Sequence, residues 1–352
     1  MAPIQLTNPI IALGSLILVT GVNGLIASHI ADQLLAAGYR VRGTVRDLVK
    51  SSWVTPLFES RHGPGNFELI QVADLAEPGV WPAALKGVAG IITVAASADL
   101  TSTKPVDDNV KEEVEGFYAL LDVANKTHTV KSVVYTSSVW AAWNPVPNIH
   151  RVVTEKTYND HAVQVAADPA IPQAEKGIAP FMAAKVKVEQ ALWDWVAREK
   201  PSFRFNSILP GTVIGPILEP DKQPASTAGF VRGLWNSDPR SLAIIKHITP
   251  LWFVDARDNA RLYLAALTTP GVEGERLFGC AERFSFPQVS KLLREAYPGK
   301  DVPELEDDGW DGTELATERP LELLRSVGQD EWTGLLQSLK DTVESFEGKT
   351  SS

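Results

Sequence analysis

Residues 16–27 read Leu16-Ile17-Leu18-Val19-Thr20-Gly21-Val22-Asn23-Gly24-Leu25-Ile26-Ala27, which places an apolar, β-branched run before two glycines and an apolar helical pattern. The run predicts a buried strand, and the spacing of the later apolar residues predicts a helix over 26–37. Gly21 suits a tight turn between them, and Gly24 lets another group approach the backbone closely. The stretch therefore predicts a strand, a glycine turn and a helix in direct succession.

This order of elements is typical of a dinucleotide-binding site. The first turn of such a helix offers free backbone N–H groups and the positive end of its dipole to a pyrophosphate. Ala27 stands where a third glycine often sits and is small enough for close packing of helix on strand. The alternative is an ordinary turn that binds nothing, because glycines mark those as well. We expect the cofactor to contact Gly21, Asn23, Gly24, Leu25 and Ile26.

The rest of the first 210 residues repeats the alternation of apolar runs with helical periodicity, which is typical of parallel strands buried under helices. The fold class predicted is α/β, a Rossmann-type doubly wound parallel sheet with a small C-terminal substrate-binding lobe. The predicted strands are 16–20, 41–45, 67–71, 90–94, 132–137 and 204–209. The predicted helices are 26–37, 111–126 and 181–198, with 255–267 and 286–297 further along the chain.

After Leu209 the regular alternation stops. Pro210-Gly211 and Gly215-Pro216 interrupt it, and residues 219–224 are polar and rich in proline. We predict a dinucleotide-binding domain over 1–210 and, over 211–352, mainly a substrate-binding lobe that interleaves with it. A cleft is expected between the two, at the carboxyl ends of the strands.

The second predicted strand indicates which dinucleotide binds. An NAD site usually has an acid at the end of this strand for the ribose hydroxyl, but residues 41–46 hold none. Arg42 and Arg46, with Lys50, predict neutralisation of a 2′-phosphate and therefore NADP(H). The alternative is that they are solvated surface side chains. Asp74-Leu75, after the third strand, suits the rim of an adenine pocket, or is simply a solvated loop.

Composition excludes several classes of partner. The 352 residues carry 33 basic and 43 acidic side chains, a formal charge of −10, so we expect no nucleic acid or anionic membrane as partner. Cys280 is the only cysteine, which excludes an intrachain disulfide and favours a reducing, cytoplasmic setting. Residues 1–31 lack charged side chains but contain no unbroken apolar span, and no histidine or carboxylate spacing indicates a metal site.

Further motifs point to a family. They are 133–138 (Val133-Val134-Tyr135-Thr136-Ser137-Ser138), 210–216 and 253–258 (Phe253-Val254-Asp255-Ala256-Arg257-Asp258). Together with 19–27, 41–46 and 72–75, they make the chain resemble the extended short-chain dehydrogenase/reductase family over most of its length. It is most similar to the branch of fungal and plant carbonyl reductases, dihydroflavonol reductases and cinnamoyl-CoA reductases.

The resemblance implies three catalytic positions, and one of them is altered. Ser138 would polarise a carbonyl oxygen, and Lys185 would hold the ribose and lower the pKa of a tyrosine four residues earlier. The matching stretch reads Phe181-Met182-Ala183-Ala184-Lys185, so the phenol that donates the proton is replaced by Phe181. Loss of a positioned general acid commonly costs about 10²–10⁴ in rate.

Three explanations of Phe181 remain open: an engineered replacement of the tyrosine, natural divergence to another proton source or another reaction, and a protein that binds cofactor and signals without chemistry. Ala119, where relatives often have an asparagine, favours divergence. If proton transfer persists, Lys185 is our hypothetical substitute donor, because a neighbouring cationic nicotinamide would make its ammonium group labile.

The resemblance also implies further contacts. Cofactor contacts are expected from Val94, Ala95, Thr136, Pro210 and Val213, and substrate contacts from Ser138, Phe181 and Tyr158. Tyr158 lies in 154–160, which resembles the substrate-covering loop of the family, although it could equally be a packing residue. The irregular segments 97–105, 143–180 and 217–252 are expected to set specificity.

The function we expect is the NADPH-dependent reduction of a small or medium ketone or aldehyde by a monomer or homodimer. One alternative is a non-redox isomerisation or cyclisation in secondary metabolism. Another is an NADP(H)-sensing regulatory protein.

Overall fold

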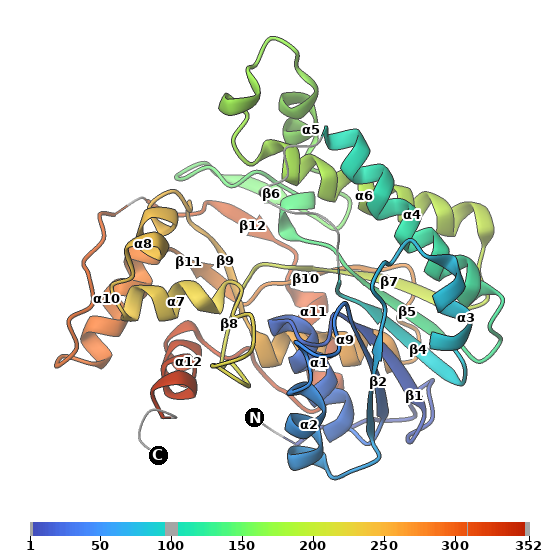
Figure 1. Ribbon diagram of the computed structural model, residues 1–352. Helices are drawn as coiled ribbons and strands as arrows, with labels where there is room; N and C mark the ends of the chain where they lie inside the picture. Colours follow the sequence, from blue (N-terminus) through green and yellow to red (C-terminus); the bar gives the residue numbers. More distant parts are fainter. Residues whose placement is uncertain (1–2, 96–104, 308, 349–352) are drawn as a thin grey trace.

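The computed structural model describes residues 3–95, 105–307 and 309–348, which form a central parallel sheet with helices on both faces (Figure 1). The described strands of this sheet run in the order β10-β7-β5-β4-β1-β2-β3, and every neighbouring pair is parallel. Their bounds are β1 (Leu16–Thr20), β2 (Arg40–Val45), β3 (Phe67–Gln71), β4 (Val88–Thr93), β5 (Ser132–Thr136), β7 (Arg204–Pro210) and β10 (Arg276–Gly279).

Helices cover both faces because the central strands are apolar on both. All five residues of β1 are buried, as expected for a parallel strand between two helical layers. One layer holds α1 (Leu25–Ala36), α9 (Ala256–Thr268) and α11 (Glu318–Ser326), and the other holds α3 (Trp81–Ala84), α4 (Val106–Asn125) and α6 (Ala179–Glu199) (Figure 1). Helix α2 (Val54–His62) packs beside β3.

The six predicted strands are all present, with ends within two residues of the prediction. The described sheet has a further edge strand, β10, which the sequence did not predict. Its four residues, Arg276-Leu277-Phe278-Gly279, are too few to show the periodicity of a strand, and β7 pairs with them across 65 intervening residues. Because β10 and α9 come from beyond residue 210, the second half of the chain returns to complete the main sheet.

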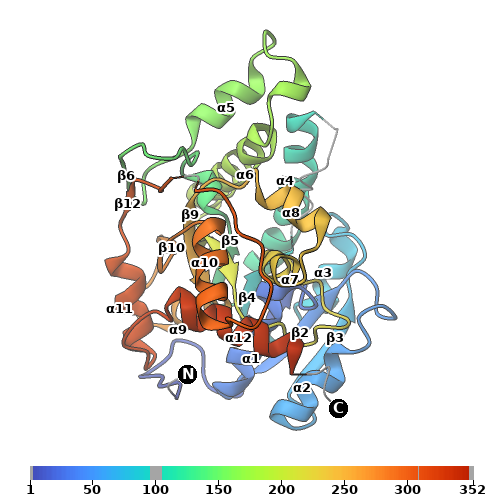
Figure 2. The ribbon, with the colours of Figure 1, turned by 90° about the vertical axis from the view of Figure 1, so that its left-hand side faces the viewer.

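A smaller lobe packs at one end of the sheet (Figure 2). Its described core is the sheet β11-β9-β8, made of β8 (Thr212–Ile214), β9 (Leu251–Asp255) and β11 (Glu282–Phe284). Around it lie α7 (Ala228–Trp235), α8 (Pro239–Ile245), α10 (Phe286–Ala296) and α12 (Leu335–Glu347). A strand pair of β6 (Arg151–Val153) with β12 (Thr313–Leu315) lies above, and α5 (Asp160–Ala167) projects from the molecule.

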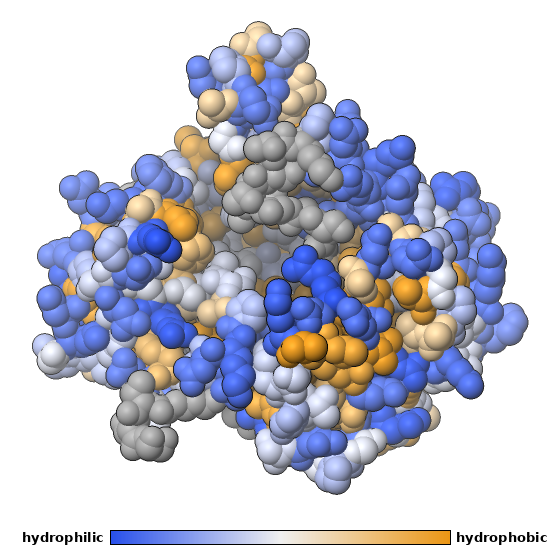
Figure 3. Space-filling view, in the orientation of Figure 1, coloured by the Kyte–Doolittle hydropathy of each residue, from blue (hydrophilic) through white to orange (hydrophobic). Residues whose placement is uncertain are grey.

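The face drawn in Figure 3 is hollowed near its centre, and the side chains around the hollow are mostly hydrophilic. Of the three segments expected to set specificity, 97–105 falls outside the described residues except for Pro105. Within the described ranges, no helix is both long and apolar enough to cross a membrane.

Candidate active site

A groove of about 900 Å³ opens at the carboxyl ends of β1, β2 and β4. In a doubly wound sheet, ligands bind where neighbouring strands leave in opposite directions, which here is between β1 and β4. Its walls are Gly21, Asn23, Gly24, Leu25, Ile26, Ala27, Thr44, Arg46, Asp47, Lys50, Ser51, Val72, Ala73, Asp74, Leu75, Val94, Ala95, Pro224 and Ser226.

The glycine turn that the sequence predicts forms the floor of this groove. Gly21 has a φ of +68°, and a Cβ there would lie 3.1 Å from the Cβ of Ala95, so only glycine suits the position. Gly24 is the N-cap of α1 in an extended conformation, with no side-chain cap. The backbone N–H groups of the first turn are therefore left for a ligand, which fits a pyrophosphate.

The end of β4 is tied to the end of β1 beside this turn. Thr20 Oγ1 accepts hydrogen bonds from the backbone N–H of Val94 at 2.9 Å and of Ala95 at 3.0 Å. Both residues were expected to contact a cofactor, and the structure places both on the groove wall.

The basic rim of the groove is smaller than the sequence indicates. Arg46 and Lys50 line it, and Asp47 shapes the turn by accepting the N–H of Lys50 at 3.0 Å. Arg42 does not line the groove: its guanidinium pairs with Glu68 at 2.8 Å and donates to the carbonyl oxygen of Ala84. Residue 42 lies in the middle of β2, beside Glu68 of β3, whereas the groove opens where β2 ends.

Asp74 and Leu75 do lie on the groove wall, where an adenine rim was predicted. The Asp74 carboxylate also accepts the N–H of Ala76 at 2.9 Å, which holds the loop after β3 in a turn. The structure therefore places this acid on the groove wall and in a loop turn, and its contact with adenine stays a prediction.

The other expected cofactor residues lie outside the groove wall. Thr136 Oγ1 accepts a hydrogen bond from the hydroxyl of Tyr263 at 2.8 Å, so α9 holds its side chain. Pro210 ends β7 and pairs with Gly279. Val213 is buried in the core of the smaller lobe. None of these three residues is among those that line the groove in the structure.

A short 3-10 turn over Val139–Ala141 connects Ser138 to Trp140, the residue that packs on Phe181. Ser138 caps this turn, because its Oγ accepts the N–H of Trp140 at 3.2 Å. The indole of Trp140 meets the ring of Phe181 edge to face, with centroids 5.7 Å apart at 85°. The turn after β5 therefore packs on the first turn of α6.

Lys185 lies one turn after Phe181 on α6, with Nζ 5.5 Å from the centroid of the Phe181 ring. Its ammonium group also lies 3.4 Å from Oε1 of Glu113 on α4. Lys185 is 7% exposed and Glu113 is 3% exposed, so the pair is withdrawn from solvent.

Sequence reasoning missed Glu113, although a signal was present. The helix predicted over 111–126 turns Phe117, Leu120 and Leu121 inward, and Glu113 falls on the same stripe. An acid on the apolar face of a helix needs a buried partner, and Lys185 supplies it.

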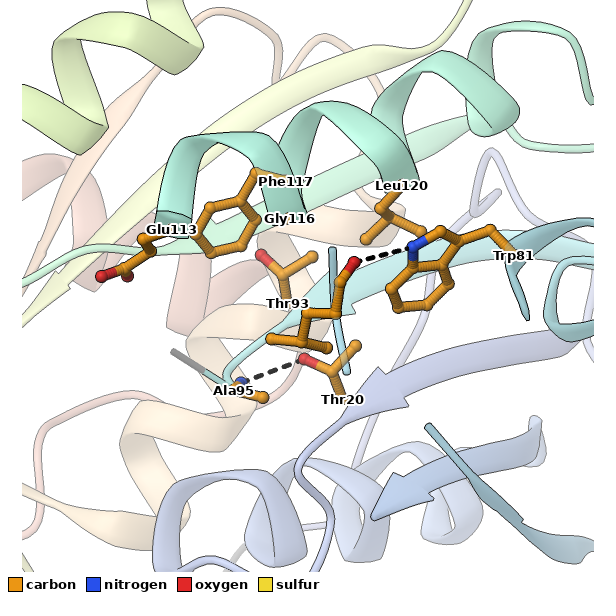
Figure 4. Close-up of a pocket in the computed structure, with 9 residues that line it drawn as sticks. Thr20, Trp81, Thr93, Ala95, Glu113, Gly116, Phe117 and Leu120 are labelled. Carbon is orange, nitrogen blue, oxygen red and sulfur yellow. Dashed lines mark hydrogen bonds between the residues drawn. The ribbon is translucent and has the colours of Figure 1, made fainter. Parts of the chain in front are cut away.

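A small cavity lies between Glu113 and the groove (Figure 4). Glu113 and Trp81 lie on opposite sides of it in the picture, with the Glu113 carboxylate directed away from the other labelled side chains, and its walls include Thr20, Leu75 and Ala95. Its volume of about 10 Å³ has room for about one water molecule. Leu75 and Ala95 also line the groove, so the cavity that Glu113 lines shares two wall residues with it.

Tyr158 has a different environment from the one expected. Its ring lies 4.1 Å from the guanidinium carbon of Arg276, and burial raises the pKa of its phenol. Arg276 is the first residue of β10 and pairs with Ser207 in the middle of β7. This contact fits a packing role and does not bring Tyr158 to Ser138.

Comparison with known proteins agrees with this geometry. The family model described as "NAD dependent epimerase/dehydratase family" matches residues 17–277. The chain is 33% identical to aldehyde reductase 2 of Sporidiobolus salmonicolor, over 97% of this chain and 98% of that one. It is 37% identical to the NAD-dependent epimerase/dehydratase terH of Aspergillus terreus (96% and 99%) and 36% identical to the ketoreductase adrE of Penicillium rubens (96% and 98%).

Solved structures share the fold. The structure of Gre2 from Candida albicans in complex with NADPH superimposes with a TM-score of 0.77 at 22% identity, covering 95% of this chain and 99% of that chain. Vestitone reductase from alfalfa gives a TM-score of 0.74 at 21% identity, over 95% and 99%. The predicted Rossmann-type α/β fold is therefore confirmed. With a family model that spans most of the chain and relatives above 30% identity over nearly its whole length, this protein belongs to the NAD dependent epimerase/dehydratase family.

Proposed function

We propose that this protein reduces an aldehyde or ketone of small or medium size with NADPH. The observation that carries the proposal is the buried Lys185–Glu113 pair, in which Glu113 lines a small cavity that shares Leu75 and Ala95 with the dinucleotide groove. Names of relatives support it, because proteins 33% and 36% identical to this chain are called aldehyde reductase and ketoreductase.

NADP(H) is the cofactor that suits the residues of the groove. The exposed Arg46 and Lys50 stand at the end of β2, where a 2′-phosphate would lie, and charge-assisted hydrogen bonds to phosphate are strong. The acid that normally selects NAD is absent from the end of that strand. The complex of Gre2 with NADPH provides a related fold that holds this cofactor.

Ser138 and Lys185 have different roles in the carbonyl reduction that we propose. Reduced nicotinamide, when bound, supplies the hydride. Ser138 already accepts a hydrogen bond from Trp140, so its own O–H is free to donate to a carbonyl oxygen. Lys185 donates the proton that a tyrosine phenol gives in enzymes with an unaltered site, because Phe181 has no hydroxyl.

Apolar carbonyl compounds suit the surroundings. Trp140 and Phe181 present two aromatic rings beside Ser138, and such rings favour apolar or aromatic ligands. We propose that the residues beyond 210, apart from those that complete the main sheet, form the lobe that binds substrate.

A panel of aldehydes and ketones tests the proposal, with NADPH oxidation and the alcohol product both measured. We expect Lys185→Met to lower kcat by about 10²–10⁴, the range for loss of a general acid. Lys187→Met is the matched control, because Lys187 lies on the same helix and pairs with Asp107 at the surface. Binding of NADPH without any carbonyl-dependent oxidation would contradict the proposal, and turnover of a substrate without NADPH oxidation would indicate isomerisation or cyclisation instead.

A further inference from the structure

Glu113 is a buried acid, so other groups must compensate the free-energy cost of burying its carboxylate. Burying a carboxylate costs several kcal/mol unless a cation and hydrogen bonds compensate. Its side chain is 2% exposed and that of Lys185 is 9% exposed, and their charged atoms lie 3.4 Å apart. The two come from different helices, α4 and α6, which pack side by side against the main sheet.

The groups around Glu113 form a polar cluster rather than an apolar core. Tyr135 faces it from β5: burial raises the pKa of this phenol, and the charge of Glu113 adds to the effect. In the part of the chain that the structure describes, Tyr135 Oη and Thr93 Oγ1 are buried and have no hydrogen-bond partner. The water-sized cavity lies beside this cluster and is lined by Thr93 and Glu113.

Glu189, the second buried acid of this region, has its own ionic and hydrogen-bond partners. Glu189 is fully buried, pairs with Arg276 at 2.9 Å and 3.0 Å, and accepts a hydrogen bond from Ser207 at 2.8 Å. Such a bidentate pair is a structural link between α6 and β10. Glu113 differs, because its described ionic partner is Lys185, the group that the proposed function uses to move a proton.

We propose that Glu113 is a positioning residue that holds the ammonium group of Lys185 near Phe181 and returns a proton to it after each turnover. This inference rests on the proposed function and deepens it. The arrangement substitutes for the phenol that is absent at position 181.

The proton balance of one cycle is as follows. Hydride adds to the carbonyl carbon and the π electrons move to the oxygen, which takes a proton as the Nζ–H bond of Lys185 breaks. Lys185 is then a neutral amine beside Glu113. A proton taken up from solvent reaches the Glu113 carboxylate and passes to Nζ, so each cycle consumes one carbonyl compound, one NADPH and one proton and yields one alcohol and one NADP⁺.

Glu113→Gln is the variant that tests this inference, because glutamine keeps the shape and an acceptor for Nζ but carries no charge. We expect NADPH affinity, measured by fluorescence titration without substrate, and KM to stay within about twofold. We expect kcat to fall by about 10- to 100-fold, a fraction of the effect of deleting a general acid, and to become more sensitive to D₂O. Glu113→Asp should recover part of the loss.

Glu115→Gln is the matched control, because it removes the same charge from an exposed position two residues along α4. Its kcat should equal that of the unaltered protein. A second comparison uses the Phe181→Tyr background, in which a phenol supplies the proton. There Glu113→Gln should change kcat by less than about threefold if the carboxylate serves Lys185.

An unchanged kcat in Glu113→Gln, or an equal loss in both backgrounds, overturns the inference and leaves the proposed function standing. A loss of NADPH affinity that accounts for the whole effect also overturns it, since Glu113 would then act through cofactor binding. If Glu113→Gln does not fold, the same comparisons are made with Glu113→Asp, where an unchanged kcat and D₂O effect overturn the inference. If neither the unaltered protein nor Phe181→Tyr oxidises NADPH with any carbonyl compound, the proposed function fails and the inference fails with it.

Discussion

Phe181 differs from a tyrosine by one oxygen atom, and the side chains of Trp140 and Lys185 lie beside its ring. Its ring packs on Trp140, and Lys185 turns toward Glu113 rather than toward a phenol. The sequence placed Phe181 and Lys185 correctly one turn apart, since i and i+4 share a helix face. It could not reveal Glu113, because the contact between α4 and α6 joins residues 72 positions apart.

At the same scale, Arg46 and Arg42 form a natural pair of variants. Arg46→Ala should weaken NADPH binding by about 10-fold and leave NADH binding nearly unchanged, because it removes a charge-assisted hydrogen bond to the 2′-phosphate. Arg42→Ala should leave the affinity for NADPH unchanged, since Arg42 is held by Glu68 outside the groove. Fluorescence titration with both cofactors measures this. An equal loss of NADPH and NADH affinity in Arg46→Ala would contradict the assignment of the 2′-phosphate to this rim.

Among the elements, β2 carries a glycine that the packing of the cofactor turn requires. A Cβ on Gly43 would collide with Cγ1 of Val22, which lies in the glycine turn, and would lie 3.0 Å from Cζ of Phe67. Gly43→Ala should therefore lower the free energy of unfolding by about 1–3 kcal/mol, as overpacking does.

Urea denaturation measures this change, and Gly299→Ala is the control. A Cβ on Gly299 would meet nothing within 4 Å, so this variant should stay within about 0.5 kcal/mol of the unaltered protein. A Gly43→Ala protein as stable as the control would show that Val22 and the turn can shift without cost.

The elements also show where sequence reasoning reached its limit. Apolar runs such as those of β1 and β5 predict buried parallel strands, and both strands were predicted from the sequence. The edge strand β10 has four residues and takes its place only by pairing with β7. The position of Arg42 along β2, short of the groove, likewise depends on where the strand ends relative to its neighbours.

At the scale of the whole molecule, His29 links the main sheet to the smaller lobe. Its Nε2 lies 2.7 Å from the carbonyl oxygen of Pro216, which follows β8, so this nitrogen carries the hydrogen. Burial lowers the pKa of His29 below its ordinary value of 6.5, against the opposing effects of the Pro216 hydrogen bond, Asp255 and Asp32.

The sign of the resulting pH dependence follows from proton binding. Below about pH 6.5 the unfolded chain binds a proton at His29 that the folded chain does not, so the free energy of unfolding falls as the pH falls. One group contributes at most about 1.4 kcal/mol per pH unit. Denaturation experiments at pH 7.5 and 5.5 should therefore show that the free energy of unfolding is lower at pH 5.5. This decrease should be smaller in His29→Gln than in the unaltered protein.

The titration of Asp32 does not contribute to the difference in stability between pH 7.5 and 5.5. Burial opposes its ionisation, but hydrogen bonds from Arg61 and His62 lower its pKa below 3.8, so its contribution is lost only under more acidic conditions. An equal loss of stability in His29→Gln and the unaltered protein would show that His29 does not cause the change.

Much of the overall fold could be predicted from the sequence. Hydrophobic periodicity predicts the sheet and the helical layers, and the glycine turn locates the dinucleotide groove. The contacts of Tyr158 with Arg276 and of Glu113 with Lys185 could not be predicted, since both join segments that only the finished fold brings together.

The central claim is that this protein transfers hydride to a carbonyl carbon although Phe181 offers no proton. The most direct measurement supplies NADPH deuterated at C4 of the nicotinamide, with a panel of aldehydes and ketones, to the unaltered protein and to Phe181→Tyr. Mass spectrometry then locates deuterium in the alcohol. We predict deuterium on the carbinol carbon of the alcohol with both proteins, because Lys185 supplies the proton where Phe181 cannot. Binding of the labelled cofactor by both proteins, with no deuterated alcohol from either, would contradict the account.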